Sequence, residues 1–104
     1  MRQFCFLIPV LHDADRKPHA AWLWDDFETA LAQNFGGFSR HADVCGSWLD
    51  NDRGAIVQDH SRHYSVAFDG PENQLEKLLR LYREAFGQKC IYVAETSSNA
   101  YLLG

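Results

Sequence analysis

The residue types in this sequence that most readily move protons or act as nucleophiles are its five histidines and three cysteines. His63 and Tyr92 fall on expected strands, at positions that face the same side of a sheet, where they could exchange a proton with a bound small molecule. Cys45 is expected on the strand beside His63, and a cysteine needs such a base to become a nucleophile. A hydrogen-bonded histidine at a protein interface is the alternative explanation for His63.

The histidines do not follow a recognised metal-binding pattern. His60 and His63 are three residues apart, which sends their side chains to opposite faces of a strand. His12 and His19 lie in or beside an acidic loop, without the spacing of a known metal site. We therefore expect no metal site and no other cofactor.

The cysteines indicate free thiols. Cys5, Cys45 and Cys90 are odd in number, far apart and outside any C-x-x-C motif, which fits a reducing compartment better than a disulfide framework. Cys5 and Cys90 lie near the starts of two neighbouring antiparallel strands, so their thiols should sit at opposite ends of the sheet, too far apart for a disulfide.

Length and composition predict one folded domain. The chain has 104 residues, 46% of them hydrophobic and 13% aromatic, so we expect a single domain over residues 1–104, with 96–104 as a C-terminal tail. The net charge of −4 and the scattered basic residues argue against autonomous nucleic-acid binding. No apolar run approaches the roughly 20 residues that span a bilayer, and no signal-peptide pattern is evident, so we expect a cytoplasmic protein without membrane association.

Two helices are expected. The clearer one covers Pro71–Gly87, with Asp69 as its cap and Gly87 as a left-handed stop. Its apolar stripe repeats at helical spacing: Leu75, Leu78, Leu79, Tyr82, Ala85 and Phe86. The other runs from about Pro18 to the glycine pair after Phe35, with an inner stripe of Leu23, Phe27, Ala30, Leu31 and Asn34, widened by Trp24 and Phe35.

Four strands complete the pattern. Aromatic, β-branched and alternating apolar residues predict strands over Phe4–Val10, Phe38–Leu49, Ile56–Phe68 and Cys90–Glu95. The turn residues of Asp50–Gly54 join the middle two into a hairpin. This order predicts an α+β, ferredoxin-like βαββαβ fold: a four-stranded antiparallel sheet, in strand order 4-1-3-2, with both helices on one face.

Several short motifs can be placed on these elements: Phe35-Gly36-Gly37-Phe38-Ser39, Gly46-x-Trp48, Tyr64-x-Val66 and Phe86-Gly87-Gln88 followed by Ile91-Tyr92-Val93. With them, residues 4–95 resemble small bacterial and mobile-element proteins that are grouped as domains of unknown function. The resemblance implies the same ferredoxin-like fold. It implies no catalytic residue, because that family has no established activity. Phe38 stands where relatives are expected to have a smaller or β-branched residue.

The sheet face opposite the helices should be uncovered. Alternation places eight largely small or apolar residues there: Cys5, Leu7, Cys45, Leu49, His63, Ser65, Ala67 and Tyr92. Such a surface is too apolar to remain in water over a large area. A homodimer packed sheet against sheet would cover it, and so would the C-terminal tail. The leading hypothesis is therefore a non-enzymatic binding or assembly module that dimerises through this face.

Two other functions remain open. A small enzyme or small-molecule-binding protein would use a cleft on the same face, with Cys45, His63 and Tyr92. An inhibitor from a mobile element would dock on a host protein through its acidic surface and an exposed tryptophan. Trp22 and Trp24 point about 200° apart on a helix, so one of them should be exposed, and Trp24 is a candidate contact residue.

Overall fold

The structure, a computed structural model, describes residues 1–96. These residues form, in order, β1 (Arg2–Pro9), α1 (Ala21–Phe35), β2 (Ser39–Arg40), β3 (Val44–Asp50), β4 (Ala55–Phe68), α2 (Glu72–Ala85) and β5 (Tyr92–Thr96). Thr96 belongs to the last strand and not to a tail, and residues 97–104 lie outside the described part. Neither helix is long and apolar enough to cross a membrane.

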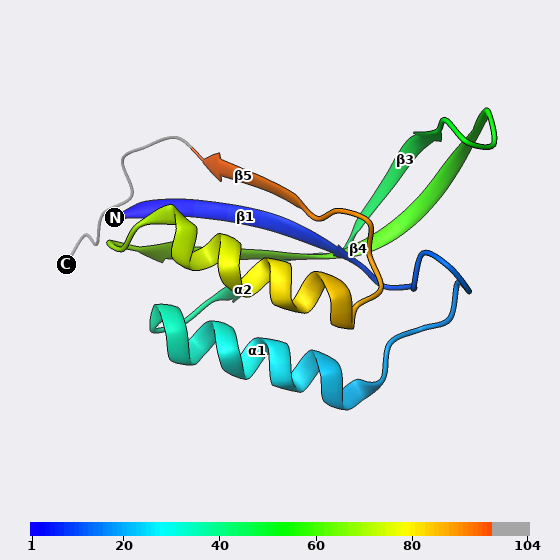
Figure 1. The fold of residues 1–104 in the computed structure, drawn as a ribbon. Coiled ribbons are helices and arrows are strands. Elements are labelled where there is room, and N and C mark those ends of the chain that lie inside the picture. Colours follow the sequence, from blue (N-terminus) through cyan, green and yellow to red (C-terminus); the bar gives the residue numbers. More distant parts are fainter. Residues whose placement is uncertain (97–104) are drawn as a thin grey trace.

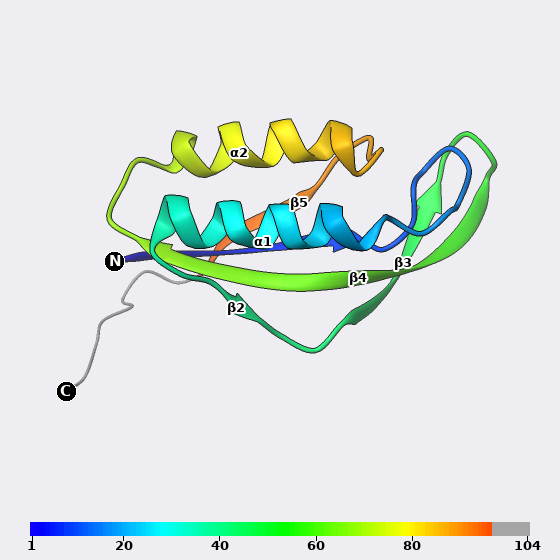
Figure 2. The same ribbon diagram turned by 90° about the horizontal axis from the view of Figure 1, so that it is seen from below.

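The two helices lie side by side on one face of a single sheet, as Figures 1 and 2 show from two directions. All strand pairs are antiparallel, and β1 lies between β4 and β5. Both β2 and β3 pair with the other edge of β4. The predicted α+β class and antiparallel sheet are confirmed, but the described sheet has five strands and not the predicted four in the order 4-1-3-2.

The expected second strand is divided into β2 and β3 because it contains one extra residue. Arg40 is directly opposite Tyr64, and Val44 is opposite Ser61. Residues 41–43 therefore face only two residues of β4. An insertion of this kind has the residue count of a β-bulge, which bends the strand and shifts the alternation of its side chains by one position.

This shift corrects two predicted positions. Cys45 is opposite His60 and Leu49 is opposite Ile56. These β4 residues are even-numbered, like Tyr64, whose buried ring points toward the helices. Cys45 and Leu49 are thus on the helix side of the sheet, and the prediction that placed them on the uncovered face is wrong.

Helix α1 begins at Ala21 and not near Pro18, because Pro18 forms an isolated bridge with Leu11. It ends at Gly36, which has a left-handed φ of 78° and donates its N–H to the carbonyl of Ala32. This glycine stop was predicted. The buried residues follow the predicted stripe: Leu23, Trp24, Phe27, Leu31 and Phe35. The predicted inner residue Asn34 is instead exposed.

Helix α2 starts without a side-chain cap. Asp69 lies 3.5 Å from the N-terminal amine of Met1 and does not cap the helix as predicted. Gly87, with φ 60°, provides the expected left-handed stop, and its N–H donates to the carbonyl of Glu84. Most of the predicted stripe is buried, namely Leu75, Leu79, Tyr82 and Phe86, whereas Leu78 is half-buried and Ala85 is exposed.

The core between helices and sheet is largely aromatic. Phe27 of α1 is fully buried, and its ring centroid lies 5.0–6.1 Å from those of Phe6, Tyr64, Tyr82 and Phe86. Most of these pairs are edge to face, the arrangement that the ring quadrupole favours. The core therefore fixes the helices to one face of the sheet, and the other face is left for a possible site.

Candidate functional site

We call the sheet face opposite the helices the open face. Residues directly opposite each other on neighbouring strands share a face, so the register defines its members: Gln3, Cys5, Leu7 and Pro9 on β1, Ser61, His63, Ser65 and Ala67 on β4, and Tyr92, Ala94 and Thr96 on β5. Each of these side chains is uncharged at neutral pH when the histidine is neutral.

The open face brings together four of the residues predicted as ligand or interface candidates. Leu7 lies between His63 on one side and Tyr92 on the other. Cys5 is in the next row, opposite Ser65. Tyr92 is 57% exposed, so a phenol ring stands in solvent at the edge of a half-buried apolar surface.

His41 also belongs to this site, although no sequence pattern predicted it. Its N–H donates to the carbonyl of His63 over 2.9 Å, and its Nε2 lies 2.8 Å from the hydroxyl of Ser65. The same alternation that selected Cys45 also covers His41, four residues earlier, but no motif marks it. The bulge between them keeps His41 on the open face and moves Cys45 to the other side.

The two histidine rings influence each other. Their centroids are 4.5 Å apart. Burial, and then the nearby charge of His41 when it is protonated, lower the pKa of His63. His63 is therefore held in the neutral form at neutral pH, in which its imidazole has one nitrogen that accepts and one that donates. Ser65, His41 and His63 could together bind or move a proton.

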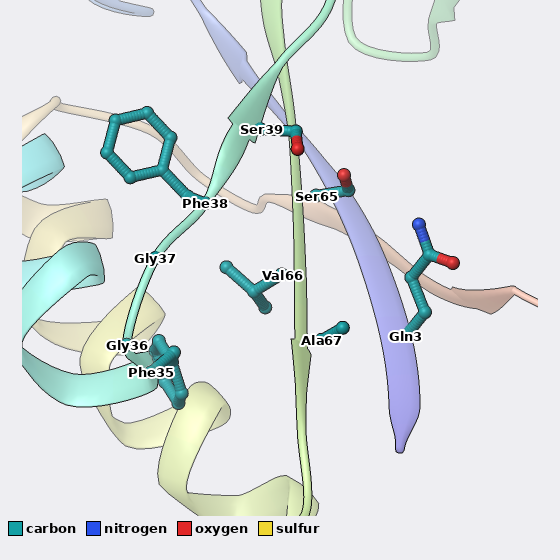
Figure 3. A pocket seen from close by; sticks show the side chains of 9 residues that line it. All are labelled: Gln3, Phe35, Gly36, Gly37, Phe38, Ser39, Ser65, Val66 and Ala67. Carbon is teal, nitrogen blue, oxygen red and sulfur yellow. The ribbon is translucent and has the colours of Figure 1, made fainter. Parts of the chain in front are cut away.

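A pocket of about 230 Å³ adjoins Ser65, where the chain after α1 leaves the edge of β4 (Figure 3). Its polar side chains are those of Gln3, Ser39 and Ser65. The other lining residues are apolar or glycine: Phe35, Gly36, Gly37, Phe38, Val66 and Ala67. The pocket and the histidine pair thus share the side chain of Ser65.

Beyond the body of the sheet, β3 and the first half of β4 form a hairpin that projects away from the helices (Figure 1). We call residues 44–60 the arm. Three large apolar residues on it are exposed, and Ile56 is the most exposed at 73%: Trp48, Leu49 and Ile56. Cys45 lies on the arm opposite His60, so the predicted pair of Cys45 and His63 is not formed.

The remaining candidates are placed as follows. Trp24 is only 7% exposed and packs under the guanidinium of Arg62, whose Cζ is 4.0 Å from the ring centroid. It is a core residue, and Trp22, at 68% exposure, is the tryptophan that faces solvent. The three cysteines are free thiols. Among the described residues, no group of three or more potential metal ligands comes together.

The arrangement defines a small α+β protein with a ferredoxin-like sheet, and within residues 1–96 both helices lie on the same face of that sheet. No family model matches the sequence, and no curated protein sequence matches it. The resemblance to domains of unknown function, and with it a bacterial or mobile-element origin, therefore stays a prediction.

Solved structures share the fold at low identity. A phage SAM lyase in complex with S-methyl-5'-thioadenosine is 16% identical, with a TM-score of 0.64, over 88% of this chain and 78% of that chain. The divalent cation tolerance protein CutA1 from Thermus thermophilus is 10% identical, with a TM-score of 0.64, over 98% of this chain and 88% of that one. CutA from Synechococcus elongatus is 12% identical, with a TM-score of 0.53, over 91% and 75%. These similarities concern the fold alone.

Proposed function

We propose that the protein is a non-enzymatic binding module that self-associates by packing the open faces of two copies together. One observation carries this proposal: where it pairs across β1, β4 and β5, the open face is a partly apolar surface with no charged side chain among the described residues, in a protein whose net charge is −4. Leu7 at its centre is only half-buried, and Tyr92 at its edge is exposed. A soluble chain gains free energy when such a surface is covered.

A second copy of the chain is a suitable partner for the open face because of the symmetry of a two-fold dimer. In a two-fold interface each patch meets its own copy, so any charge on the patch meets a like charge. An uncharged face avoids this repulsion. Trp48, which is opposite Val57 and so lies on the open-face side of the arm, could extend the same interface, because the arm projects beyond the body of the protein (Figure 1).

Native mass spectrometry of tag-free protein tests the proposal. We expect a dimer for the natural sequence and a monomer for Leu7→Asp, with an unchanged circular dichroism spectrum, since the new carboxylate would be desolvated in the interface. Leu81→Asp is the matched control, because Leu81 is 68% exposed on α2, away from the open face, and this variant should remain a dimer. A monomeric natural protein, or a dimeric Leu7→Asp variant, would refute the proposal.

We also propose a cytoplasmic location. The support is the set of free thiols, Cys5, Cys45 and Cys90, which a reducing compartment preserves. Cell fractionation with an antibody against the protein, using a soluble cytoplasmic marker as the reference, would test it. Recovery in the membrane or extracellular fraction would contradict the proposal.

A small-molecule-binding protein or small enzyme is the second candidate. The observation in its favour is the 2.8 Å contact between Ser65 and His41 beside a pocket. A protein of similar fold, the phage SAM lyase, has been solved with S-methyl-5'-thioadenosine. In this candidate, His63 and Tyr92 serve as proton donor or acceptor near the pocket. A reproducible additional mass on the natural protein, absent from a Ser65→Ala variant, would support this function over simple assembly.

A further inference from the structure

Strand β4 loses its neighbour before it ends. Strand β2 pairs with only two residues of β4, Tyr64 and Ser65. The segment that precedes β2, which contains the glycine pair and comes from α1, does not pair with β4. Figure 3 shows this segment separating from β4 at the pocket. Within the described residues, the last part of β4, residues 66–68, therefore has no strand on that side.

The backbone groups of Ala67 point toward this gap. The carbonyl of His63 accepts a hydrogen bond from His41, on the β2 side, whereas the carbonyl of His60 accepts one from Val10, on the β1 side. Backbone groups of successive residues in a strand alternate between the two sides. The pairing of β4 with β1 continues without a break to the end of β4. The N–H and the carbonyl of Ala67 therefore point to the same side as the carbonyl of His63, which is the side of β2.

The surroundings of Ala67 match a small neutral ligand. Among the described residues, the lining of the pocket includes the carboxamide of Gln3 and the hydroxyl of Ser39 but no charged side chain. Phe35 and Phe38 add aromatic surface, and the glycine pair contributes a wall without side chains. A volume of about 230 Å³ is below the range of sites for drug-sized molecules and suits a single ring system.

We propose that this pocket binds a flat heterocycle of nucleobase size, whose adjacent donor and acceptor pair with the carbonyl and the N–H of Ala67. A peptide strand is a poorer match, because strand addition uses several successive backbone pairs. Within residues 1–96, Ala67 is the one residue of this strand edge that offers such a pair, since β4 ends at Phe68. The inference gives the small-molecule candidate a site and a ligand class, and it does not depend on self-association.

Two matched ligands test the role of the strand edge. In 9-methyladenine the amino group and a ring nitrogen form an adjacent donor and acceptor, and 9-methylpurine lacks the amino donor. We expect 9-methyladenine to shift the amide NMR signals of Gly37, Ser39 and Ala67, and 9-methylpurine to bind at least about tenfold more weakly. Equal binding of the two ligands, or no shift with 9-methyladenine, would overturn the proposal.

A proline at position 67 tests the backbone contact. Ala67→Pro removes the N–H that faces the pocket without removing a bond to β1, and proline is tolerated at such a strand edge. Leu81→Ala is the control, because Leu81 is exposed on α2 and does not line the pocket. We expect Ala67→Pro to weaken binding of 9-methyladenine at least about tenfold and Leu81→Ala to bind like the natural protein. Undiminished binding by Ala67→Pro would refute the assignment.

A third variant covers the case in which the proline variant does not fold. Ser39 is exposed at the rim of the pocket, so Ser39→Trp should fold and fill the pocket. Loss of the 9-methyladenine shifts in this variant supports the site, and retained shifts refute it. Native mass measurements on the same samples report self-association separately, so failure of this inference and failure of the assembly proposal can be told apart.

Discussion

The imidazole rings of His41 and His63 lie 4.5 Å apart on the open face, and the backbone of His41 donates a hydrogen bond to the carbonyl of His63. One ring follows β2 and the other belongs to β4, so the pair joins the edge of the sheet to its interior. Two protonated imidazoles at this distance repel each other. Burial is the first cause of the lowered pKa of His63, and this repulsion from His41 is the second.

The histidine pair predicts that acid weakens self-association. Protonation of His63 in both copies would place two positive charges in an interface between two open faces, with no carboxylate from the residues that define the face. We expect the dimer fraction, measured by sedimentation, to fall as the pH decreases from 6.5, the ordinary pKa of histidine, to about pH 5. A double variant, His41→Gln with His63→Gln, should remain dimeric over this range. A dimer fraction independent of pH in the natural protein would show that the pair is outside the interface.

His19 predicts a loss of folding stability in acid. It is only 8% exposed, its Nε2 donates to the carbonyl of Pro9 over 2.9 Å, and its buried Nδ1 has no hydrogen-bond partner among the described residues. Its ring packs against Trp24 and Phe86. Burial is the main cause of its lowered pKa. The unfolded chain therefore binds a proton at this side chain more readily than the folded one.

Because the pKa of His19 is lower in the folded chain than in the unfolded chain, acid should destabilise the fold. The free energy of unfolding should be unaffected by His19 above pH 6.5, the ordinary pKa of histidine, and should decrease as the pH falls below it. Urea unfolding at about pH 7.5 and pH 5 measures the change. Since His63 contributes in the same direction, His19→Gln should reduce the pH dependence without abolishing it. Equal pH dependence in the variant would contradict the prediction.

The hydrogen bond of the Tyr64 hydroxyl should stabilise the fold. Its hydroxyl donates to the carboxylate of Glu28 over 2.6 Å, and Arg62 contacts the same carboxylate oxygen at 3.0 Å. Burial and this carboxylate raise the pKa of Tyr64. Tyr64→Phe should lower the free energy of unfolding by about 1.5–3 kcal/mol, the range for a hydrogen bond to a charged group. Trp22→Phe is the control, because Trp22 is 68% exposed on α1, and it should change stability by less than about 0.5 kcal/mol.

The helices could be predicted from the sequence, whereas the division of the second strand could not. The stripe of α2 and the glycines after both helices are local patterns, and burial followed them. At residues 41–43 the sequence His-Ala-Asp continues the alternation into Val44 without a glycine or proline that would mark an insertion. The bulge depends on how this segment pairs with β4, which is a tertiary property.

The site was predicted only where alternation continued unbroken. Cys5, Leu7, His63 and Tyr92 lie on regular strands, so their common face followed from parity. Cys45 lies beyond the bulge, and its predicted side was therefore wrong. The pocket could not be predicted at all, because it exists where one chain segment leaves the edge of another, and no residue pattern encodes that departure.

Phe86 gives the sharpest test of the helix placement. It follows the last turn of α2, is fully buried, and contacts the rings of Trp24 and Phe27 at centroid distances of 4.7 and 5.4 Å. Phe86→Ala should lower the free energy of unfolding by about 3–5 kcal/mol, because it leaves a cavity between both helices and the sheet. Leu81→Ala, on the exposed side of α2, should cost less than about 0.5 kcal/mol. Urea unfolding measures both, and similar losses in the two variants would mean that the apolar stripe of α2 does not face the core.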